Sequence, residues 1–288
     1  AFSVSGFFTG NVVHAVRPML AAPADGHLRG LLLELLVGSP AVVALRAELE
    51  AILLDDNAYI VLRLHALFCL LGDSTYEPNE VLRSLVDIGN LNALRLASEI
   101  FIKMADAVPY DPLCRALEAC ASLYPTDRFD RSHVMGELYF IKRLVRELDL
   151  EITVRLLDQL TRTLRCTCGQ ERHRCHCRDG ASKIVGLLLD NYFEHGRGPH
   201  DPDQDWDWVR NLHFHGQWGA DRSAAVSALQ ADDTLRRALY KRAFLGLLSP
   251  GEIRDVLFDV VQYSGHSGLS LRDGDERWLI DLAYETEN

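Results

Sequence analysis

Residues 55–73 of this chain read DDNAYIVLRLHALFCLLGD. Five apolar residues within this stretch recur at i, i+4, i+7, i+8 and i+11, which is the spacing of one face of an α-helix; they are Ile60, Leu64, Leu67, Phe68 and Leu71. The pair Gly72-Asp73 is a typical helix stop. The stretch therefore predicts a helix from about residue 59 to residue 71.

The same helical spacing recurs along the chain, whereas the alternation of apolar and polar residues that is typical of strands never persists. One predicted helix follows Ser249-Pro250-Gly251-Glu252, which is a capping box with proline at the first helical position. Asp273 with Glu276 indicates the start of a last helix in the same way. Further stripes lie within residues 94–105, 157–164, 185–192 and 253–261. The predicted fold class is all-α.

Several predicted helices carry an aliphatic residue followed by arginine near their start, namely Leu62-Arg63, Leu94-Arg95 and Val154-Arg155. Residues 55–73 resemble the second helix of a HEAT-like repeat, with Asp in the turn, this pair early in the helix and Leu-Gly-Asp at its end. The intervals between such pairs are irregular. Irregular helical hairpins still stack, because each buries its apolar face on its neighbours. We expect an irregular HEAT-like α-solenoid of helical hairpins, with a compact helical bundle as the alternative.

Residues 196–219 interrupt the helical pattern. This segment is rich in Gly, Pro, Asp, Trp and His, and it predicts a long ordered loop or a boundary. It separates an N-terminal helical-repeat block, residues 1–195, from a C-terminal helical block, residues 220–288. The chain begins with Ala1, and residues 1–26 do not resemble the start of a domain. We therefore expect an excised segment of a longer protein.

The composition is that of a globular protein, with 48% hydrophobic and 25% charged residues. No apolar run reaches the length of a membrane span. The formal net charge of −11 disfavours extensive binding to nucleic acid or to an anionic membrane. Three of the seven cysteines lie in apolar helical patterns and are interpreted as small core residues: Cys69, Cys114 and Cys120. This usage fits a reducing cytoplasm.

The other four cysteines crowd into twelve residues, in the hairpin 164–180. Residues at i and i+2 point the same way only in extended or turn backbone, so both Cys-x-Cys pairs are expected between a helix ending near Leu164 and one beginning near Asp179. Gly169 suits the tight turn between the pairs. Four thiolates complete a tetrahedral zinc site without an open position for water, so such a zinc is structural. The predicted ligands are Cys166, Cys168, Cys175 and Cys177, and His173 or His176 could replace one of them.

Two other interpretations of this hairpin stay open. The thiols could be reactive or form disulfides. The hairpin is also locally basic, through Arg162, Arg165, Arg172, Arg174, Arg178 and Lys183. A zinc hairpin with arginines can bind phosphates, so the alternative function is a zinc-dependent nucleic-acid-binding module. Because the rest of the chain is acidic, we expect these cations to balance the zinc–thiolate charge instead.

The sequence contains partial matches to several catalytic or metal-binding motifs, and none of them is complete. The alternating Asp201, Asp203, Asp205 and Asp207 have the spacing of a calcium loop, but Trp206 and Leu212 occupy the positions that require glycine and glutamate. His213 and His215 could serve a metal-dependent hydrolase with these aspartates, yet no third ligand is identifiable. Gly265-His266-Ser267 lacks the final glycine of a nucleophile elbow, and the chain has no phosphate loop. We expect this chain not to be an enzyme.

The chain resembles the helical-repeat region that follows the nucleotide-binding core in large bacterial STAND ATPases of the NACHT type. The similar stretches are HLRGLLLELLVGSP (27–40), AYIVLRLHALFCLLGD (58–73), CHCRDGASKIVGLLLDNYFEH (175–195) and GHSGLSLRDGDERWLIDLAYETEN (265–288). The resemblance implies a sensor or scaffold that recognises a protein ligand, often a foreign protein during phage infection, or adjacent domains of its own polypeptide. It implies no ATPase, effector or ligand-binding residue in this segment.

Overall fold

The computed structural model describes residues 10–22, 26–104, 107–124, 139–163, 179–196, 198–210, 223–245 and 269–286. Within these ranges the chain forms fourteen α-helices, one 3-10 helix and no strand. This confirms the predicted all-α fold class. Among the described helices, no stretch combines the length and the hydrophobicity that a transmembrane helix requires.

The chain divides into two compact units. Unit 1 comprises Ala1–Cys120 with Glu137–Leu144, and unit 2 comprises Ala121–Gly136 with Val145–Asn288. The predicted division at residues 196–219 stays a prediction. The interpretation of that whole segment as loop is wrong in part, because Pro202–Val209 form helix α12. Asp201 starts this helix by accepting a hydrogen bond from the Asp203 backbone N–H, and Pro202 takes the first helical position, where its missing N–H costs nothing.

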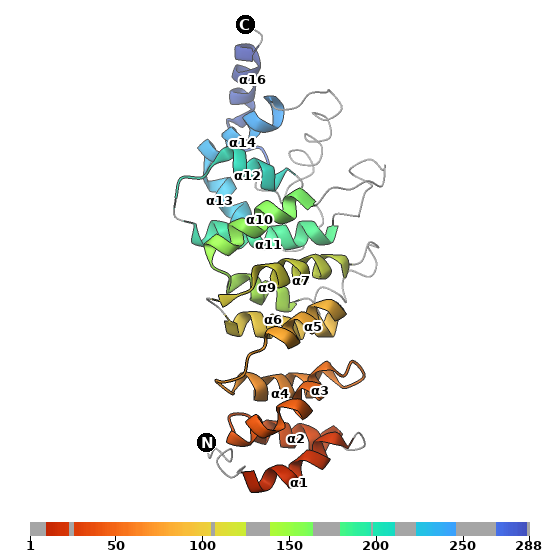
Figure 1. Cartoon of the computed structure of the whole chain (residues 1–288). Helices are drawn as coiled ribbons and strands as arrows, with labels where there is room; N and C mark the ends of the chain where they lie inside the picture. Colours follow the sequence, from red (N-terminus) through yellow and green to blue (C-terminus); the bar gives the residue numbers. More distant parts are fainter. Residues whose placement is uncertain are drawn as a thin grey trace. The chain divides into compact units, whose positions relative to one another are not determined.

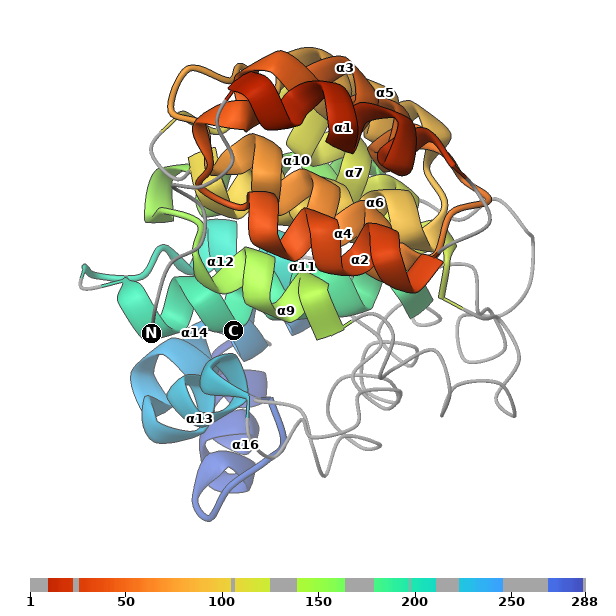
Figure 2. The same ribbon diagram turned by 90° about the horizontal axis from the view of Figure 1, so that it is seen from below.

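Unit 1 is built from helical hairpins packed in two layers. Helices α1, α3 and α5 contact one another in sequence and form one layer, while α2, α4 and α6 form the other; each helix also contacts its partner in the hairpin. Figures 1 and 2 show this order along the unit. The elements are α1 (Gly10–Ala21), α2 (Gly26–Leu36), η2 (Pro40–Leu45), α3 (Arg46–Leu54), α4 (Ile60–Leu71), α5 (Asn79–Ile88) and α6 (Leu91–Met104). Helices α7 (Tyr110–Ser122) and α9 (Tyr139–Arg146) contribute residues to both units.

Unit 2 follows the same principle. Helix α10 contacts α12, which contacts α14, while α11 contacts α13; the pairs α10–α11 and α13–α14 join the two layers. The bounds are α10 (Leu150–Thr163), α11 (Asp179–His195), α13 (Ala224–Ala231), α14 (Asp233–Leu245) and α16 (Asp275–Thr286). The predicted stripe of α11 is largely confirmed, since Val185, Leu188 and Leu189 are buried and Tyr192 is half-buried.

The last helix begins differently from the prediction. Helix α16 starts at Asp275, after Gly274, whose φ of 91° lies in the left-handed region that favours glycine. Asp273 is exposed, whereas the Asp275 side chain is buried and accepts a hydrogen bond from the Arg272 backbone N–H at 3.0 Å. The helix is therefore confirmed, but Asp275 rather than Asp273 anchors its start. The capping box at residues 249–252 and the stripe after it lie outside the described residues.

Helix α4 occupies the predicted range, but its buried face is not the predicted stripe. Its buried residues are Leu62, Arg63, Ala66, Leu67, Cys69 and Leu70. From the predicted stripe only Leu67 is fully buried, and Phe68 is 41% exposed. The reason is that α4 is apolar around almost its whole circumference, so periodicity alone could not select the side that packs. One apolar side packs into the core of unit 1, and the other faces outward.

Candidate functional site

The predicted zinc ligands Cys166, Cys168, Cys175 and Cys177 lie outside the described residues, as do His173, His176, His213, His215 and Ser267. The helices on either side are described, and they end at Thr163 and begin at Asp179, close to the predicted positions. Within the described ranges no three His, Cys, Asp or Glu side chains are grouped to hold a metal ion. Cys69, Cys114 and Cys120 are buried, as expected for core residues.

The outward side of α4 continues onto α2 as an exposed apolar surface. Five residues, each between 38% and 59% exposed, form what we call the α2–α4 face: Leu28, Leu31, Leu35, Val61 and Phe68. Leu28, Leu31 and Leu35 are spaced by three and four positions on α2, and Val61 and Phe68 are seven apart on α4, so each set lies along one side of its helix.

Close contacts between α2 and α4 bring these two sides together. Gly30 faces α4, since a Cβ there would lie at an ordinary van der Waals distance of 3.6 Å from Leu62 Cδ2. The Cys69 thiol donates a hydrogen bond to the Leu33 carbonyl oxygen over 3.1 Å. Glu34 Oε1 lies 3.7 Å from His65 Nε2. Because Glu34 is adjacent to Leu31 and Leu35 on α2, and His65 lies between Val61 and Phe68 on α4, this pair places both apolar rows side by side.

The chemistry of the α2–α4 face is that of a contact surface. Its members carry no nucleophile, acid or base, and the Glu34–His65 pair lies among aliphatic and aromatic side chains. Large exposed apolar residues that are contiguous, rather than scattered singly, are typical of surfaces that bind other proteins. This face can bury apolar area against a partner, and it can offer one carboxylate at its centre.

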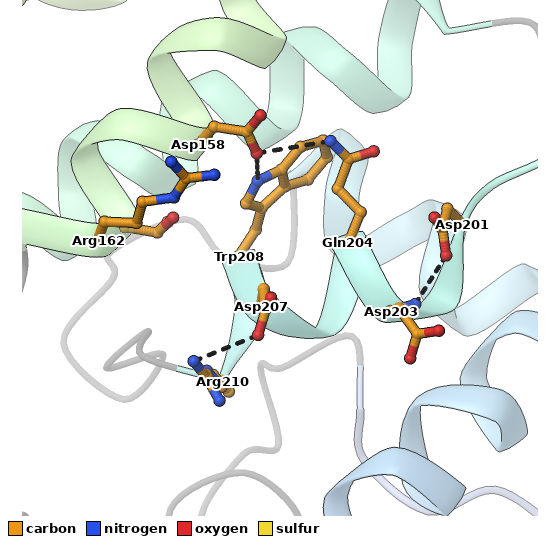
Figure 3. A pocket seen from close by; sticks show the side chains of 9 residues that line it. Asp158, Arg162, Asp201, Asp203, Gln204, Asp207, Trp208 and Arg210 are labelled. Carbon is orange, nitrogen blue, oxygen red and sulfur yellow. Dashed lines mark hydrogen bonds and ion pairs between the residues drawn. The ribbon is translucent and has the colours of Figure 1, made fainter.

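A polar pocket lies in unit 2, between α10 and α12, and has a volume of about 490 Å³ (Figure 3). Its walls combine carboxylates with two arginines and the edge of an indole. The lining residues are Asp158, Thr161, Arg162, Asp201, Asp203, Gln204, Asp207, Trp208 and Arg210.

Most of the carboxylates in this pocket already have partners. The Trp208 indole N–H donates to Asp158 Oδ1 over 2.8 Å, which fixes α12 to α10. Asp203 accepts from Arg242 of α14 at 2.7 Å, and Asp207 lies 3.2 Å from Arg210. Asp203 and Asp207 thus lie on one side of α12 with separate arginine partners, whereas Asp205 lies on the opposite, buried side. The alternating aspartates do not converge on one point, which agrees with the failure of the calcium-loop match.

Asp205 is the member of this series that points into the protein. Its side chain is fully buried, and no described residue gives either carboxylate oxygen a hydrogen bond. His200 Nδ1 lies 3.5 Å from Oδ2 of Asp205 and 3.2 Å from the Tyr192 hydroxyl. Burial raises the pKa of Asp205 to about 7; the charge of Asp201 adds to this rise, and the Tyr192 hydroxyl opposes part of it.

A second buried charge cluster escaped the sequence analysis. Arg236 of α14 is buried and donates to Asp275 Oδ2 through Nε over 3.1 Å, and Arg237 Nε donates to Asp275 Oδ1 over 3.0 Å. A signal for Arg236 was present, because Leu235-Arg236 is an aliphatic–arginine pair early in its helix, as Leu62-Arg63 is. Of the three pairs selected from the sequence, only Arg63 is buried, while Arg95 and Arg155 are exposed.

No protein-family model matches this chain, and comparisons with curated proteins and with solved structures found no similar protein.

Proposed function

We propose that this chain is a non-catalytic helical-repeat module that binds a protein ligand or a neighbouring domain through the α2–α4 face. The observation that carries the proposal is the exposure of Leu28, Leu31 and Leu35 on α2 and of Val61 and Phe68 on α4, two helices that pack side by side. A partner that covers these five side chains gains about 25 cal/mol of binding free energy for each Å² of apolar surface removed from water. The two-layered packing of hairpins in each unit supports an irregular HEAT-like α-solenoid, a scaffold that presents one layer of helices to its ligands.

The resemblance to bacterial NACHT-type STAND ATPases supports a more specific role. In that role the chain is the sensor or scaffold part of a cytoplasmic defence ATPase, and the zinc of the cysteine hairpin is structural. The apolar character of the α2–α4 face fits a protein ligand better than a nucleic acid, since phosphates are bound by cationic surfaces.

Site-specific photocrosslinking tests the proposal. A photoreactive amino acid is placed at Leu31 or at Phe68, both of which are exposed and can be replaced without disturbing the core. We expect both positions to crosslink the same protein or the same neighbouring domain, and L31E/F68E to abolish the crosslink from Val61 while leaving the circular-dichroism melt unchanged. The matched control is the photoreactive residue at Ile280, which is 57% exposed on α16. Equal crosslinking from Ile280, or none from the α2–α4 face in the native cell, contradicts the proposal.

A further inference from the structure

Helix α12 carries a buried carboxyl group, that of Asp205, whose surroundings favour the protonated, neutral form. Asp205 is buried on the side of α12 opposite the exposed Asp203 and Asp207, and it lies near Tyr192 of α11 and His200. Its neighbours are two rings of α11, Tyr192 and Phe193, and the imidazole of His200 in the connection between the two helices. The His200 ring is 4.8 Å from the Phe193 ring, centre to centre, which holds the imidazole beside the carboxyl group.

The same cluster attaches α12 to α11. The Trp208 ring meets the Tyr192 ring edge-on with centroids 5.1 Å apart, and Tyr192 meets His200 edge-on at 5.5 Å. Trp208 lies one turn after Asp205 on α12, so the carboxyl group and the indole are on neighbouring positions of one surface. Any change in how Asp205 is accommodated therefore reaches the residues that line the polar pocket.

Among the described residues, no arginine or lysine pairs with Asp205, and the nearest basic group is the His200 imidazole, with Nδ1 3.5 Å from Oδ2. On α10, Asp158 is engaged by the Trp208 indole. On α14, Arg242 is paired with Asp203 on the exposed side of α12. Asp201, at the start of α12, is itself acidic and disfavours a second negative charge. The remaining polar neighbours are His200, 3.5 Å from Oδ2, and the Tyr192 hydroxyl, which lowers the pKa of Asp205.

From this arrangement we infer that Asp205, His200 and Tyr192 form a proton-operated latch, which holds α12 against α11 when Asp205 is protonated and loosens when Asp205 loses its proton. Among the described residues, an ionised carboxylate in this position accepts no hydrogen bond and meets no arginine or lysine, only the His200 imidazole, and burying such a group is costly. A protonated carboxyl group is neutral and can donate its proton to His200 Nδ1 or to the Tyr192 oxygen. The pocket on α12 is thereby linked to pH.

The sign of this linkage is opposite to that of a salt-bridged aspartate. The pKa of Asp205 is raised from 3.8 to about 7, so the unfolded or opened state releases the proton more readily than the closed state. The stabilisation is fully present below about pH 4 and is lost progressively as the pH rises to about 7. Between pH 5 and pH 7 the equilibrium constant for opening is expected to rise on the order of fiftyfold through this one group.

Hydrogen exchange at two amides of α12, corrected for the intrinsic pH dependence of exchange, measures the opening. The amides are those of Asp205 and Arg210, which donate to the carbonyl oxygens of Asp201 and Trp206 over 2.9 Å. In the wild-type chain we expect the protection of these two amides against exchange to fall about fiftyfold between pH 5 and pH 7. In D205N protection should be high at both values. In the control D207N, which alters an exposed carboxylate of the same helix, the fall should persist.

A direct titration keeps the inference falsifiable even if D205N does not fold. The ¹³C shift of the Asp205 carboxyl carbon in the wild-type chain should titrate with a midpoint near neutrality. A midpoint below pH 5 would show a carboxylate that stays ionised while it is buried, and the latch would be refuted. An unchanged loss of α12 protection in D205N would refute it equally.

Discussion

Arg63 and Asp56 form an ion pair of 2.8 Å in which the guanidinium is fully buried and the carboxylate is half exposed. Arg63 Nε also donates to the Leu53 carbonyl oxygen, over 2.8 Å. Asp56 in turn accepts two hydrogen bonds from the Asn90 amide, at 2.8 and 2.9 Å, and Asn90 accepts from the Ala93 backbone N–H at the start of α6. One chain of polar contacts therefore joins the turn before α4 to the turn before α6, which gives the buried Arg63 a structural role.

Arg63→Ala should destabilise unit 1 by on the order of 3 kcal/mol, because it removes a buried cation and leaves the Leu53 carbonyl oxygen without this donor. Urea unfolding followed by circular dichroism measures the change. The control is Arg95→Ala, since Arg95 has the corresponding place in the sequence pattern but is exposed, and it should change the free energy of unfolding by less than about 0.5 kcal/mol. Equal losses in the two variants would show that burial of Arg63 is not the cause.

Truncation to alanine should affect the stability of the protein very differently at Leu67 and at its neighbour Phe68 in α4. Leu67 is fully buried, so Leu67→Ala should cost about 2 to 5 kcal/mol of stability through lost burial and a residual cavity. Phe68 is 41% exposed, and Phe68→Ala should leave the free energy of unfolding nearly unchanged while weakening crosslinking from the α2–α4 face. Thermal melts of both variants separate stability from binding. A large destabilisation by Phe68→Ala would mean that this side of α4 is a packing surface.

Asp275→Asn should destabilise unit 2 by about 3 kcal/mol at neutral pH, because Arg236 and Arg237 lose their shared carboxylate. Asp273→Asn, two residues earlier and exposed, should have little effect. Burial alone would raise the pKa of Asp275, but hydrogen bonds from the Arg272 N–H, Arg237 and Arg236 outweigh it and lower the pKa. This contribution is thus present above pH 3.8 and lost as the pH falls further, and acid unfolding curves of both variants check the window.

The zinc hypothesis predicts one tightly held zinc ion per chain. Cys175→Ser should release the metal and lower the melting temperature, since a closed site contributes on the order of 10 kcal/mol to folding. Elemental analysis and thermal melts measure both effects. Cys120→Ala is the control: burial raises the pKa of the Cys120 thiol to about 12, so it is a poor thiolate donor, and its removal should leave the zinc content unchanged. If Cys175→Ser keeps its zinc and its melting temperature, the metal site is wrong.

The alternative function, a zinc-dependent nucleic-acid-binding module, predicts a binding affinity that depends strongly on salt. If the basic hairpin binds nucleic acid, the affinity must fall steeply with salt and be lost in R172E/R174E. Fluorescence anisotropy with single- and double-stranded oligonucleotides tests this over a range of salt concentrations. We expect no salt-dependent binding from the wild-type chain.

Helix positions were predictable from the sequence where one face was clearly more apolar than the other. In α11 the predicted residues Val185, Leu188 and Leu189 are buried, although the packed side also includes the polar Asn191, which donates hydrogen bonds to the Leu148 carbonyl oxygen and to Thr153 Oγ1. In α4 the same method chose the wrong face, because that helix is apolar on both sides. The inner face is decided by which neighbours it meets, and those contacts come from helices distant in sequence.

Candidate sites were harder to predict, since burial of a charge depends on tertiary packing. The alternating aspartates of α12 look equivalent in sequence, yet Asp203 is exposed and Asp205 is buried against Tyr192 and His200. Likewise the arginine pattern did not separate Arg63, which is buried, from Arg95, which is exposed. Sequence spacing identifies the residue type, and only the packed neighbours determine its protonation and its role.

The two-layered order of α1 to α6 affects how unit 1 folds and unfolds. The main contacts join each hairpin to the next, so contacting residues are mostly close in sequence and the relative contact order is low. If unit 1 is the proposed solenoid, it is expected to nucleate at any hairpin and to fray from its ends. A protease is therefore expected to cleave the outermost helices of unit 1 first, while the middle hairpins of this unit stay folded.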